Sequence, residues 1–213
     1  LKSAQWGFDS PRQHQARGYA YLLGRYLGDG CISKCRYSHR LRIFLNKKQP
    51  HVIRQCMASL AWVLPSHRVG LVKRGEIVEV TSYFRGWPAL FPQCGPGRKN
   101  SRLIELAFWQ QILVRLYPEQ FIRGCIDSDG CRHRRIVRGK NYPAYSSNNS
   151  SDDLLSLFCW ACSLASIRWR RANTFTISIA RRPDVARMDT FVMASTLPEG
   201  GNETGRTGLA NGL

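Results

Sequence analysis

Two aspartates stand at matching places in a duplicated segment of the chain. Residues 21–31 read YLLGRYLGDGC and residues 121–131 read FIRGCIDSDGC, so each apolar segment ends in Asp-Gly-Cys. Two carboxylates brought together at helix ends repel each other, and divalent cations relieve that conflict. Mg²⁺ prefers oxygen ligands, and paired metal ions promote phosphodiester hydrolysis. Asp29 and Asp129 are therefore candidate metal ligands; the alternative is that each is a plain helix-end residue.

Small residues predict that the two segments pack closely as helices. Gly24 and Gly28, like Gly124 and Ser128, are four positions apart and so share one helical face. Small side chains on that face allow two helix backbones to approach each other. An interior glycine costs a helix roughly 1 kcal/mol, and a close contact would compensate for it. We therefore expect the helices to end side by side.

Weaker matches between the two halves follow in the same order. Asn46 and Asn148 each precede an amphipathic stretch, Lys73 falls opposite Arg170, and residues 78–81 resemble residues 175–178. The offset between the halves drifts slightly from one match to the next, as different loop lengths would produce. The chain is therefore expected to contain the same structural unit twice.

The pattern of apolar residues gives both halves the same order of elements. In the first half it predicts a helix over 12–28, strands over 31–37 and 40–46, a helix over 50–63, strands over 68–73 and 76–83, and a short helix from 86. In the second half it predicts a helix over 117–128, strands over 131–138 and 142–148, a helix over 152–165, strands over 167–171 and 174–180, and a helix over 183–194. Residues 105–116 are expected to form a helix leading into this half. We assign 1–92 to an N-terminal half, 93–104 to a linker, 105–194 to a C-terminal half and 195–213 to a flexible tail.

The strands alternate between apolar and polar residues. Leu41, Ile43 and Leu45 are expected to face one side of a sheet, with Arg40 and Arg42 on the other. A sheet with helices on its apolar face and a basic open face suits the major groove of DNA. An ordinary solvent-facing sheet is the alternative.

The charge balance also indicates a nucleic-acid partner. Lys and Arg number 32 against 14 Asp and Glu, a net charge of +18. The mutual repulsion of so many positive charges destabilises the folded chain, and proteins that retain such a charge usually bind a polyanion. A membrane surface fits less well, because no apolar run approaches the roughly 20 residues of a spanning helix. No secretory signal pattern opens the sequence, so we expect an intracellular protein that is not secreted.

Cysteine and histidine patterns give little support for another metal site. Cys31 with Cys35, and Cys159 with Cys162, lack a second pair at zinc-binding spacing. The second of these pairs falls within an apolar pattern, so we expect it on the buried face of a helix. The five histidines show no ligand spacing, and we assign them no role.

LLGRYLGDG (22–30) and IRGCIDSDG (122–130) resemble the nine-residue motif of the LAGLIDADG homing endonucleases. The expected element order is also similar to that family, over roughly residues 12–194. The resemblance implies an α+β fold of two pseudo-symmetric αββαββα half-domains that form a saddle of antiparallel sheets in a monomer. It also implies site-specific cleavage of double-stranded DNA at a long target, with 3′ overhangs and an intron or intein origin.

The resemblance suggests roles for particular residues. Asp29 and Asp129, with the backbone carbonyls of Gly28 and Ser128, would bind Mg²⁺ as two or three divalent ions, for which Mn²⁺ or Ca²⁺ could substitute. Family members also place a basic and a polar side chain near the metals. Repeat position nominates Lys73 and Arg170 for the basic role, and Asn46 and Asn148 for the polar role. Arginine cannot serve as a base, and the asparagines could instead cap the helices that follow.

Strand and hairpin positions nominate basic residues for DNA contact. These candidates are Arg36, Arg40, Arg42, Arg68, Arg132, Arg134, Arg138, Lys140 and Arg168. Of these, Arg40 and Arg42 are the preferred candidates for reading guanine. The alternative function is a nucleic-acid binder of the same fold that does not cleave, such as an intron RNA maturase or a transcription regulator. A basic structural protein, for example one associated with the ribosome, is a further alternative.

Overall fold

Each half of the protein contains a helix that runs directly into a strand. In the computed structural model, which describes residues 11–97 and 102–193, α1 (Pro11–Asp29) leads into β1 (Gly30–Lys34). In the second half, α5 (Pro118–Asp129) leads into β5 (Gly130–Val137). The predicted tail (195–213) and part of the predicted linker lie outside the described residues.

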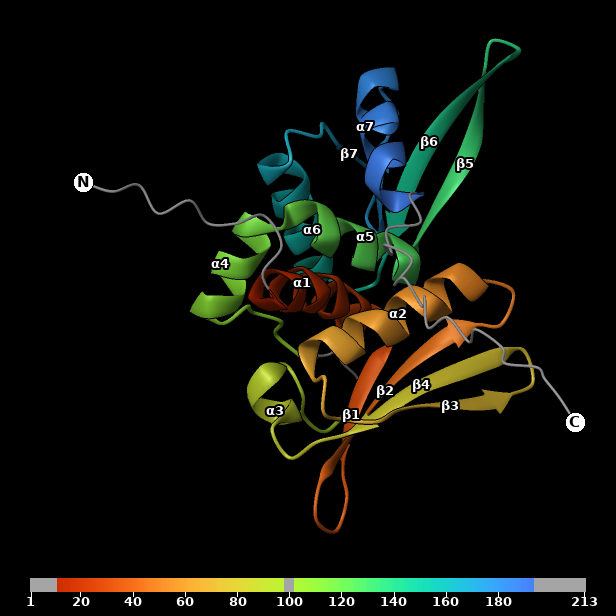
Figure 1. The fold of residues 1–213 in the computed structure, drawn as a ribbon. Helices are drawn as coiled ribbons and strands as arrows, with labels where there is room; N and C mark the ends of the chain where they lie inside the picture. The colour runs from red at the N-terminus through yellow and green to blue at the C-terminus, as the bar shows by residue number, and fades with distance from the viewer. Residues whose placement is uncertain (1–10, 98–101, 194–213) are drawn as a thin grey trace, which may run out of the picture.

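The remaining elements repeat in the predicted order (Figure 1). In the first half these are β2 (His39–Asn46), α2 (Pro50–Val63), β3 (Val69–Arg74), β4 (Ile77–Tyr83) and the short α3 (Trp87–Leu90). In the second half α4 (Phe108–Leu116) precedes α5, and β5 is followed by β6 (Lys140–Asn148), α6 (Asp152–Leu164), β7 (Arg170–Asn173), β8 (Thr176–Ile179) and α7 (Arg182–Val192).

The strands form two antiparallel sheets of the same topology. Their strand orders are β1-β2-β4-β3 and β5-β6-β8-β7. Gly30 pairs with Ile43 in the first sheet, and Gly130 pairs with Ser147 in the second. These two pairings make Ile43 and Ser147 structural counterparts. The expected α+β fold with two pseudo-symmetric halves is confirmed.

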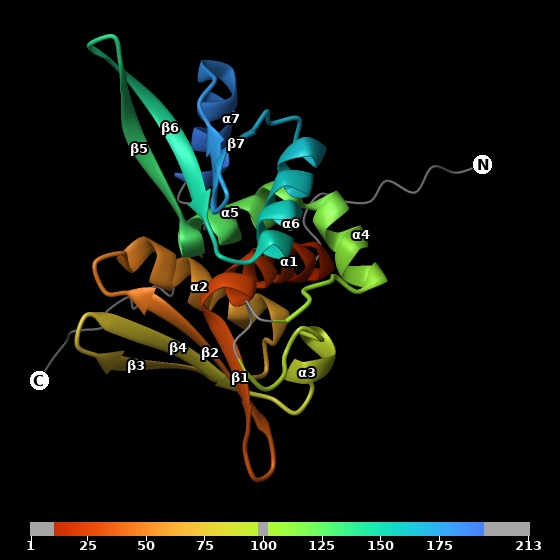
Figure 2. The ribbon, with the colours of Figure 1, turned by 180° about the vertical axis from the view of Figure 1, so that it is seen from behind.

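Helices cover one face of each sheet and meet at the centre of the molecule. Helices α1 and α5 lie side by side between the two sheets, with α2 packed on α1 and α6 packed on α5 (Figures 1 and 2). On the covered faces, Leu41, Ile43 and Val80 of the first sheet and Ile177 and Ile179 of the second are buried. The predicted alternation of β2 is therefore confirmed.

Local sequence signals explain several element boundaries. Helix α5 has a proline in its first turn, followed by Glu119, and both favour a helix N-terminus. Helix α6 is capped by Ser151, whose Oγ accepts a hydrogen bond from the Leu154 amide at 3.4 Å. The β5–β6 hairpin turns at Arg138 and Gly139, which both have positive φ, as a tight two-residue hairpin turn requires.

Two differences from the predicted elements concern β7, which begins three residues later than predicted, and the start of α4. The helix expected over 105–116 begins only at Phe108. A tertiary hydrogen bond holds the preceding chain, because the Ile104 amide donates to Asp153 Oδ2 at 2.9 Å. A local capping bond then starts the helix, because the Ala107 amide donates to the Gln110 side chain at 2.9 Å. Cys159 and Cys162 lie on the buried side of α6, as predicted. Among the described helices, none is both long and apolar enough to cross a membrane.

Candidate active site at the ends of two paired helices

The helices that carry the duplicated segment touch at backbone level. A Cβ added to Gly24 would lie 2.5 Å from the Phe121 carbonyl oxygen and 2.8 Å from the Cys125 amide nitrogen. A Cβ added to Gly124 would collide with the Tyr21 carbonyl oxygen. Because the obstructing atoms belong to backbone, neither position accepts a side chain without moving a helix. The predicted close approach through small residues is therefore present in the structure.

Asp29 ends α1 beside a buried arginine from its own helix. Its Oδ2 lies 3.3 Å from Nη2 of Arg25, one turn earlier, and the Asp29 side chain is 35% exposed while that of Arg25 is 1% exposed. The same Nη2 donates to the Phe44 carbonyl at 3.1 Å. Nε and Nη1 of Arg25 are buried and have no hydrogen-bond partner. Asp29 and one carbonyl thus compensate for the desolvation of the buried guanidinium.

Asp129 ends α5 and is held by an amide from the start of the next helix. Nδ2 of Asn149 donates to Asp129 Oδ2 at 2.8 Å, while Oδ1 of Asn149 accepts from the Ser151 amide at 2.8 Å. The Asn149 side chain is therefore fixed at both of its polar atoms. The Asp129 carboxylate also lies against the first helix, because a Cβ on Gly28 would be 2.5 Å from its Oδ2.

The chemistry of these donors fits a hard divalent cation. The two carboxylates and the carbonyls of Gly28 and Ser128 offer oxygen atoms, which Mg²⁺, Mn²⁺ and Ca²⁺ accept. The buried Oγ of Ser128 has no hydrogen-bond partner and would collide with a Cβ at Gly28. Across residues 11–97 and 102–193, no cluster of three or more His, Cys, Asp or Glu side chains forms a metal site. A cation between the helix ends would therefore complete its shell with carbonyl, water or phosphate oxygens.

Known proteins resemble this chain in structure and not in sequence. Neither a protein-family model nor a curated protein matches the sequence. The homing endonuclease I-DmoI, solved in complex with DNA and Mn, matches 86% of this chain and 99% of its own, with 14% identity and a TM-score of 0.58. I-DmoI in complex with DNA and Ca matches with 16% identity, 85% and 92% coverage and a TM-score of 0.57. The chain has the LAGLIDADG fold.

The N-terminal LAGLIDADG domain of DUF199/WhiA is also similar to this chain. It matches 92% of this chain and 88% of its own, with 13% identity and a TM-score of 0.52. All three likenesses are of fold, because so few aligned residues are identical. The side chains around Asp29 and Asp129 must therefore be judged from this chain itself.

Both asparagines predicted for the polar role form hydrogen bonds with residues of their own half. Asn46 Oδ1 accepts a hydrogen bond from the Lys48 amide at 2.9 Å, and Asn148 Oδ1 accepts from Thr176 Oγ1 at 2.7 Å. The strand register makes Phe44, and not Asn46, the counterpart of Asn148. It is the next residue, Asn149, that reaches Asp129. The run of two asparagines was the only sequence signal for it.

Lys73 and Arg170 are also not counterparts in the strand register. Lys73 pairs with Val78, which is buried on the helix-covered side, so Lys73 belongs to that side at the exposed end of β3. Arg170 pairs with Ser178, which in turn pairs with Ser146 on the open side of the second sheet. The two basic side chains therefore start from opposite faces. Their catalytic roles remain predictions.

The open face of the first sheet carries both arginines predicted to read bases. Arg40 forms an ion pair with the buried Glu79, and its Nε donates to Thr81 Oγ1 at 3.0 Å. The guanidinium of Arg42 lies 5.9 Å from the centre of the Phe44 ring. Internal contacts therefore hold Arg40 more firmly than Arg42. Of the other candidates in this half, Arg36 lies in the β1–β2 turn and Arg68 is exposed before β3.

In the second sheet, Arg132 faces the helices. Its Nε and Nη2 both donate to the carboxylate of Asp189 in α7 at 2.9 Å, and the Tyr145 hydroxyl donates to Asp189 at 2.6 Å. The hydrogen bond from Arg132 lowers the pKa of Asp189. Arg132 pairs in the ladder with the buried Tyr145, which confirms that side of the sheet. Its geometry is that of a structural ion pair between sheet and helix.

Alternation along β5 then determines which basic residues reach the open face. Arg134 shares the helix side with Arg132, whereas His133 and Arg135 lie on the open side. Arg135 was not among the nominated residues, because the sequence alone does not fix which parity of β5 faces the helices. The remaining candidates, Arg138, Lys140 and Arg168, are exposed at the hairpin tip or before β7.

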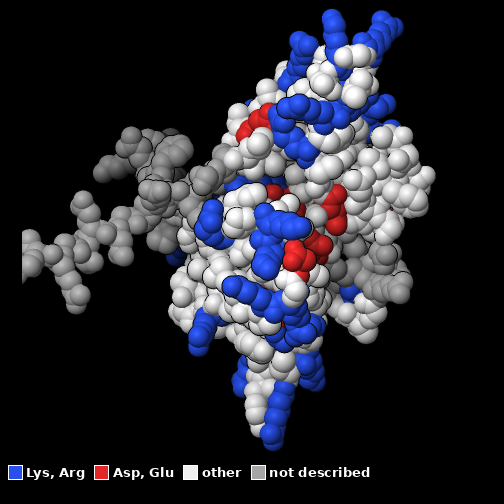
Figure 3. Space-filling model, turned by 90° about the vertical axis from the view of Figure 1, so that its right-hand side faces the viewer, with Lys and Arg blue, Asp and Glu red and all other residues white. Residues whose placement is uncertain are grey.

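The distribution of charge matches this arrangement. Figure 3 shows Lys and Arg side chains on the upper and lower projections of one face and across its middle, where Asp and Glu side chains also gather. The projections correspond to the β5–β6 and β1–β2 hairpins of Figure 1. A face on which basic side chains predominate would suit a polyanion.

A buried polar cluster joins the two helices behind the acids. The Tyr21 hydroxyl of α1 donates to Asp127 Oδ2 of α5 at 2.9 Å, and Arg123 lies 3.8 Å from the same oxygen. Burial raises the pKa of Asp127 above its ordinary value. The counterparts of Tyr21 and Asp127 are Phe121 and Leu27, so the cluster occurs once and ties the unlike halves together.

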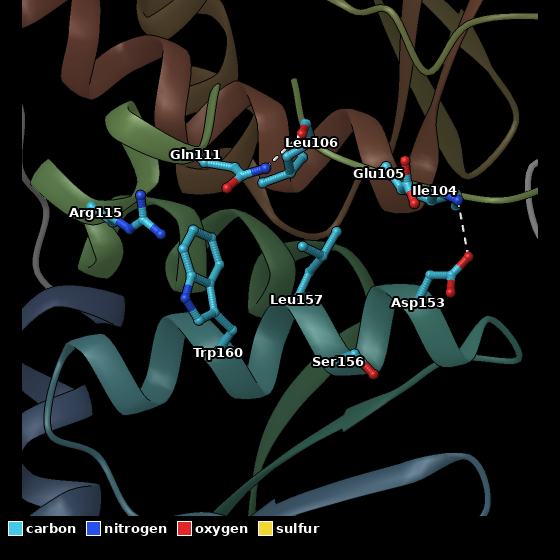
Figure 4. Close-up of a pocket in the computed structure, with 9 residues that line it drawn as sticks. All are labelled: Ile104, Glu105, Leu106, Gln111, Arg115, Asp153, Ser156, Leu157 and Trp160. Atoms are coloured by element: carbon cyan, nitrogen blue, oxygen red, sulfur yellow. Dashed lines mark hydrogen bonds between the residues drawn. The ribbon is translucent and has the colours of Figure 1, made fainter. Parts of the chain in front are cut away.

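A groove of about 580 Å³ lies between α6 and the segment that leads into α4 (Figure 4). Leu157 and Trp160 of α6 point toward this segment, and the Arg115 guanidinium lies 5.6 Å from the Trp160 ring. Asp153 accepts from the Ile104 amide at one end. None of the residues lining the groove belongs to the ends of α1 or α5. Its polar contacts hold the connecting segment against α6.

Proposed function

We propose that this protein is a divalent-metal-dependent endonuclease that cuts both strands of DNA at a long target site. The observation that carries the proposal is the position of Asp29 and Asp129 at the touching ends of two helices in a LAGLIDADG fold. I-DmoI, a homing endonuclease with this fold, has been solved with DNA and with Mn or Ca. Those complexes support double-stranded DNA as the substrate and divalent ions, Mg²⁺ foremost, as the cofactor.

The residues around the two aspartates suggest which groups bind cations, which orient the acids and which bind DNA. Asp29 and Asp129, with the carbonyls of Gly28 and Ser128, would hold the cations. A divalent cation there supplies charge stabilisation for the phosphate and a more acidic water. Asn149 orients Asp129, and basic side chains on the open faces bind the DNA backbone. One acid serves each strand, so a single intracellular monomer would cut both strands and leave staggered ends with 3′ overhangs. Such a double-strand break suits the homing of an intron or intein.

The decisive experiment tests cleavage and its two acids together. The protein is incubated with a plasmid library of randomised targets, in Mg²⁺ or in EDTA, and the ends are sequenced. Asp29→Asn and Asp129→Asn variants are tested in parallel. Defined breaks with 3′ overhangs that require Mg²⁺ and are lost in both variants are the expected result. Tight DNA binding without breaks, where a control nuclease cleaves, would contradict the proposal.

A second candidate is a binder of the same fold that does not cleave, such as an intron RNA maturase or a transcription regulator. The observation that favours it is the ion pair between Arg25 and Asp29, which already compensates one of the two acids. Its affinity for duplex DNA would be the same in Mg²⁺ and in EDTA, and no breaks would form. Filter binding with structured RNA and with duplex DNA separates the maturase from the regulator.

A further inference from the structure

We propose that Arg25 is a positioning residue that holds the Asp29 carboxylate in the cation-free protein and weakens cation binding at that acid. The inference rests on the proposed function, since it concerns the divalent cations of the same site. It assigns to the first LAGLIDADG motif a built-in competitor at the position where the second motif has Cys125.

The geometry of Arg25 fits this role. Its side chain is 1% exposed, and Asp29, at 3.3 Å, is the carboxylate that faces it. Its other hydrogen bond goes to a single backbone carbonyl, and two of its three nitrogens have no hydrogen-bond partner. The buried Asp127 of α5 also interacts electrostatically with Arg25, but Asp29 is the carboxylate that forms the ion pair with it. A buried charge with so few hydrogen bonds depends strongly on that ion pair. The ion pair therefore restricts the Asp29 carboxylate to orientations that face Arg25.

The second motif has a different side chain at this place. The counterpart of Arg25 is Cys125, because Gly24 and Gly124 meet at the helix contact. Burial raises the pKa of the Cys125 thiol, so the position carries no charge at neutral pH. Position 125 therefore cannot offer Asp129 the charged partner that Arg25 offers Asp29. Asn149, from another element, donates a neutral hydrogen bond to Asp129.

A cation that binds Asp29 must share the carboxylate with a fixed positive charge. Like charges a few ångströms apart in a half-buried site repel strongly enough to lower affinity by at least about tenfold. The guanidinium cannot relieve this repulsion by losing its proton. Removal of the Arg25 charge should therefore strengthen cation binding at Asp29 and leave the Asp129 side unchanged.

The test measures Mn²⁺ binding to the full-length protein by electron paramagnetic resonance, without DNA and without turnover. Wild type is compared with Arg25→Met, which removes the charge and keeps an unbranched chain, and with Arg25→Lys as the charge-preserving control. Arg25→Gln, which removes the charge and keeps a donor for the Phe44 carbonyl, serves if the methionine variant does not fold. Each variant is combined with Asp29→Asn or Asp129→Asn to assign the affected site.

We expect the neutral variants to bind Mn²⁺ about tenfold more tightly at the site that Asp29→Asn removes, and Arg25→Lys to resemble wild type. Unchanged or weaker binding in the neutral variants would overturn the proposal, as would an equal gain at both acids or no Mn²⁺ binding in any variant. The library cleavage experiment separates this outcome from failure of the proposed function. Cleavage with unchanged Mn²⁺ affinity refutes the role of Arg25 alone, whereas a tenfold gain without cleavage refutes the endonuclease alone.

Discussion

In the first half of the molecule Asp29 lies against a buried guanidinium one turn earlier on its own helix, whereas in the second half Asp129 receives a hydrogen bond from an amide beyond β6. The backbone that carries the acids is the same in both halves, with a helix that ends in Asp-Gly and continues as the edge strand of a sheet. The two halves thus share the placement of their acids and differ in the side chains that support them.

This difference separates the placement of the two acids from the orientation of their carboxylates. Backbone contact at Gly24 and Gly124 determines where both acids lie, so neither half can change that contact alone. The residues that orient each carboxylate come from within one half, so they can differ without moving the helices. Changes to the shared contact should therefore affect both halves alike, and changes to the supporting side chains should affect one.

The largest effect is expected from Gly24→Ala. The new Cβ would lie 2.5 Å from the Phe121 carbonyl, so the helices must separate. Overpacking of this kind costs about 1–3 kcal/mol of unfolding free energy, and cutting of both strands should fall together. Urea unfolding and strand-specific end labelling measure the two effects.

Gly18→Ala is the matched control on the same helix. Its Cβ would lie 3.3 Å from the Ser59 carbonyl, a tighter contact than usual but not a collision. We expect a loss of less than about 1 kcal/mol, partly offset by the better helix propensity of alanine. If Gly24→Ala abolished the cut in one strand and left the cut in the other strand intact, the view that the helix contact serves both halves would be contradicted.

Asn149→Ala should lower the cleavage activity or the cation affinity that depends on Asp129 by about 10- to 100-fold. The reason is that the substitution removes the group that orients a metal ligand. Asn149→Asp keeps an acceptor for the Ser151 amide but turns a carboxylate toward Asp129, so it should be as harmful with less loss of stability. Asn148→Ala, which loses a contact with Thr176 only, is the control. If Asn148→Ala and Asn149→Ala lowered activity or cation affinity equally, the role of Asn149 in orienting Asp129 would be contradicted.

A smaller effect is expected in DNA affinity, where the open and covered faces of the second sheet can be compared. Arg135→Ala should weaken binding and reduce the slope of log affinity against log salt by about 1, as loss of one phosphate contact does. Arg132→Ala should leave that slope unchanged, because Arg132 is bonded to Asp189. Fluorescence anisotropy over a range of salt concentrations measures both. The reverse pattern would mean that the ion pair opens on DNA.

The smallest effect concerns pH. Arg132 lowers the pKa of Asp189 below its unfolded value, so the pair stabilises the folded protein above that value, near 4. The contribution is lost as the pH falls through the lower folded pKa. Asp189→Asn should therefore show a flatter dependence of Tm on pH in the acid range than wild type. Both groups are about one-third exposed, so the difference should be small. Identical pH profiles would show that solvent screens the pair completely.

Much of the fold could be predicted because its signals are local. Helix α2 covers 50–63, as predicted, because a proline starts it and an apolar face runs along it. The alternation of Leu41, Ile43 and Leu45 is enough by itself to identify the covered face of β2. The duplicated Asp-Gly segments likewise located both acids, because small residues four apart are visible in the sequence.

Features that depend on pairing between distant segments could not be predicted in the same way. The register of β6 equates Asn148 with Phe44, which loop lengths concealed in the repeat comparison. Arg132 was nominated for DNA because alternation in β5 does not by itself say which parity meets a helix. The spacing of Arg25 and Asp29 was visible in the sequence, but its meaning depends on the burial of Arg25.

The contact between Gly24 and Gly124 has a consequence for any redesign of specificity. In the proposed endonuclease, the distance between the two cuts along the duplex depends on how far apart the helices hold their acids. The side chains that would choose the target lie on the sheets, which belong to different elements. Exchange of residues such as Arg42 or Arg135 should therefore yield enzymes with new target preferences and an unchanged length of overhang.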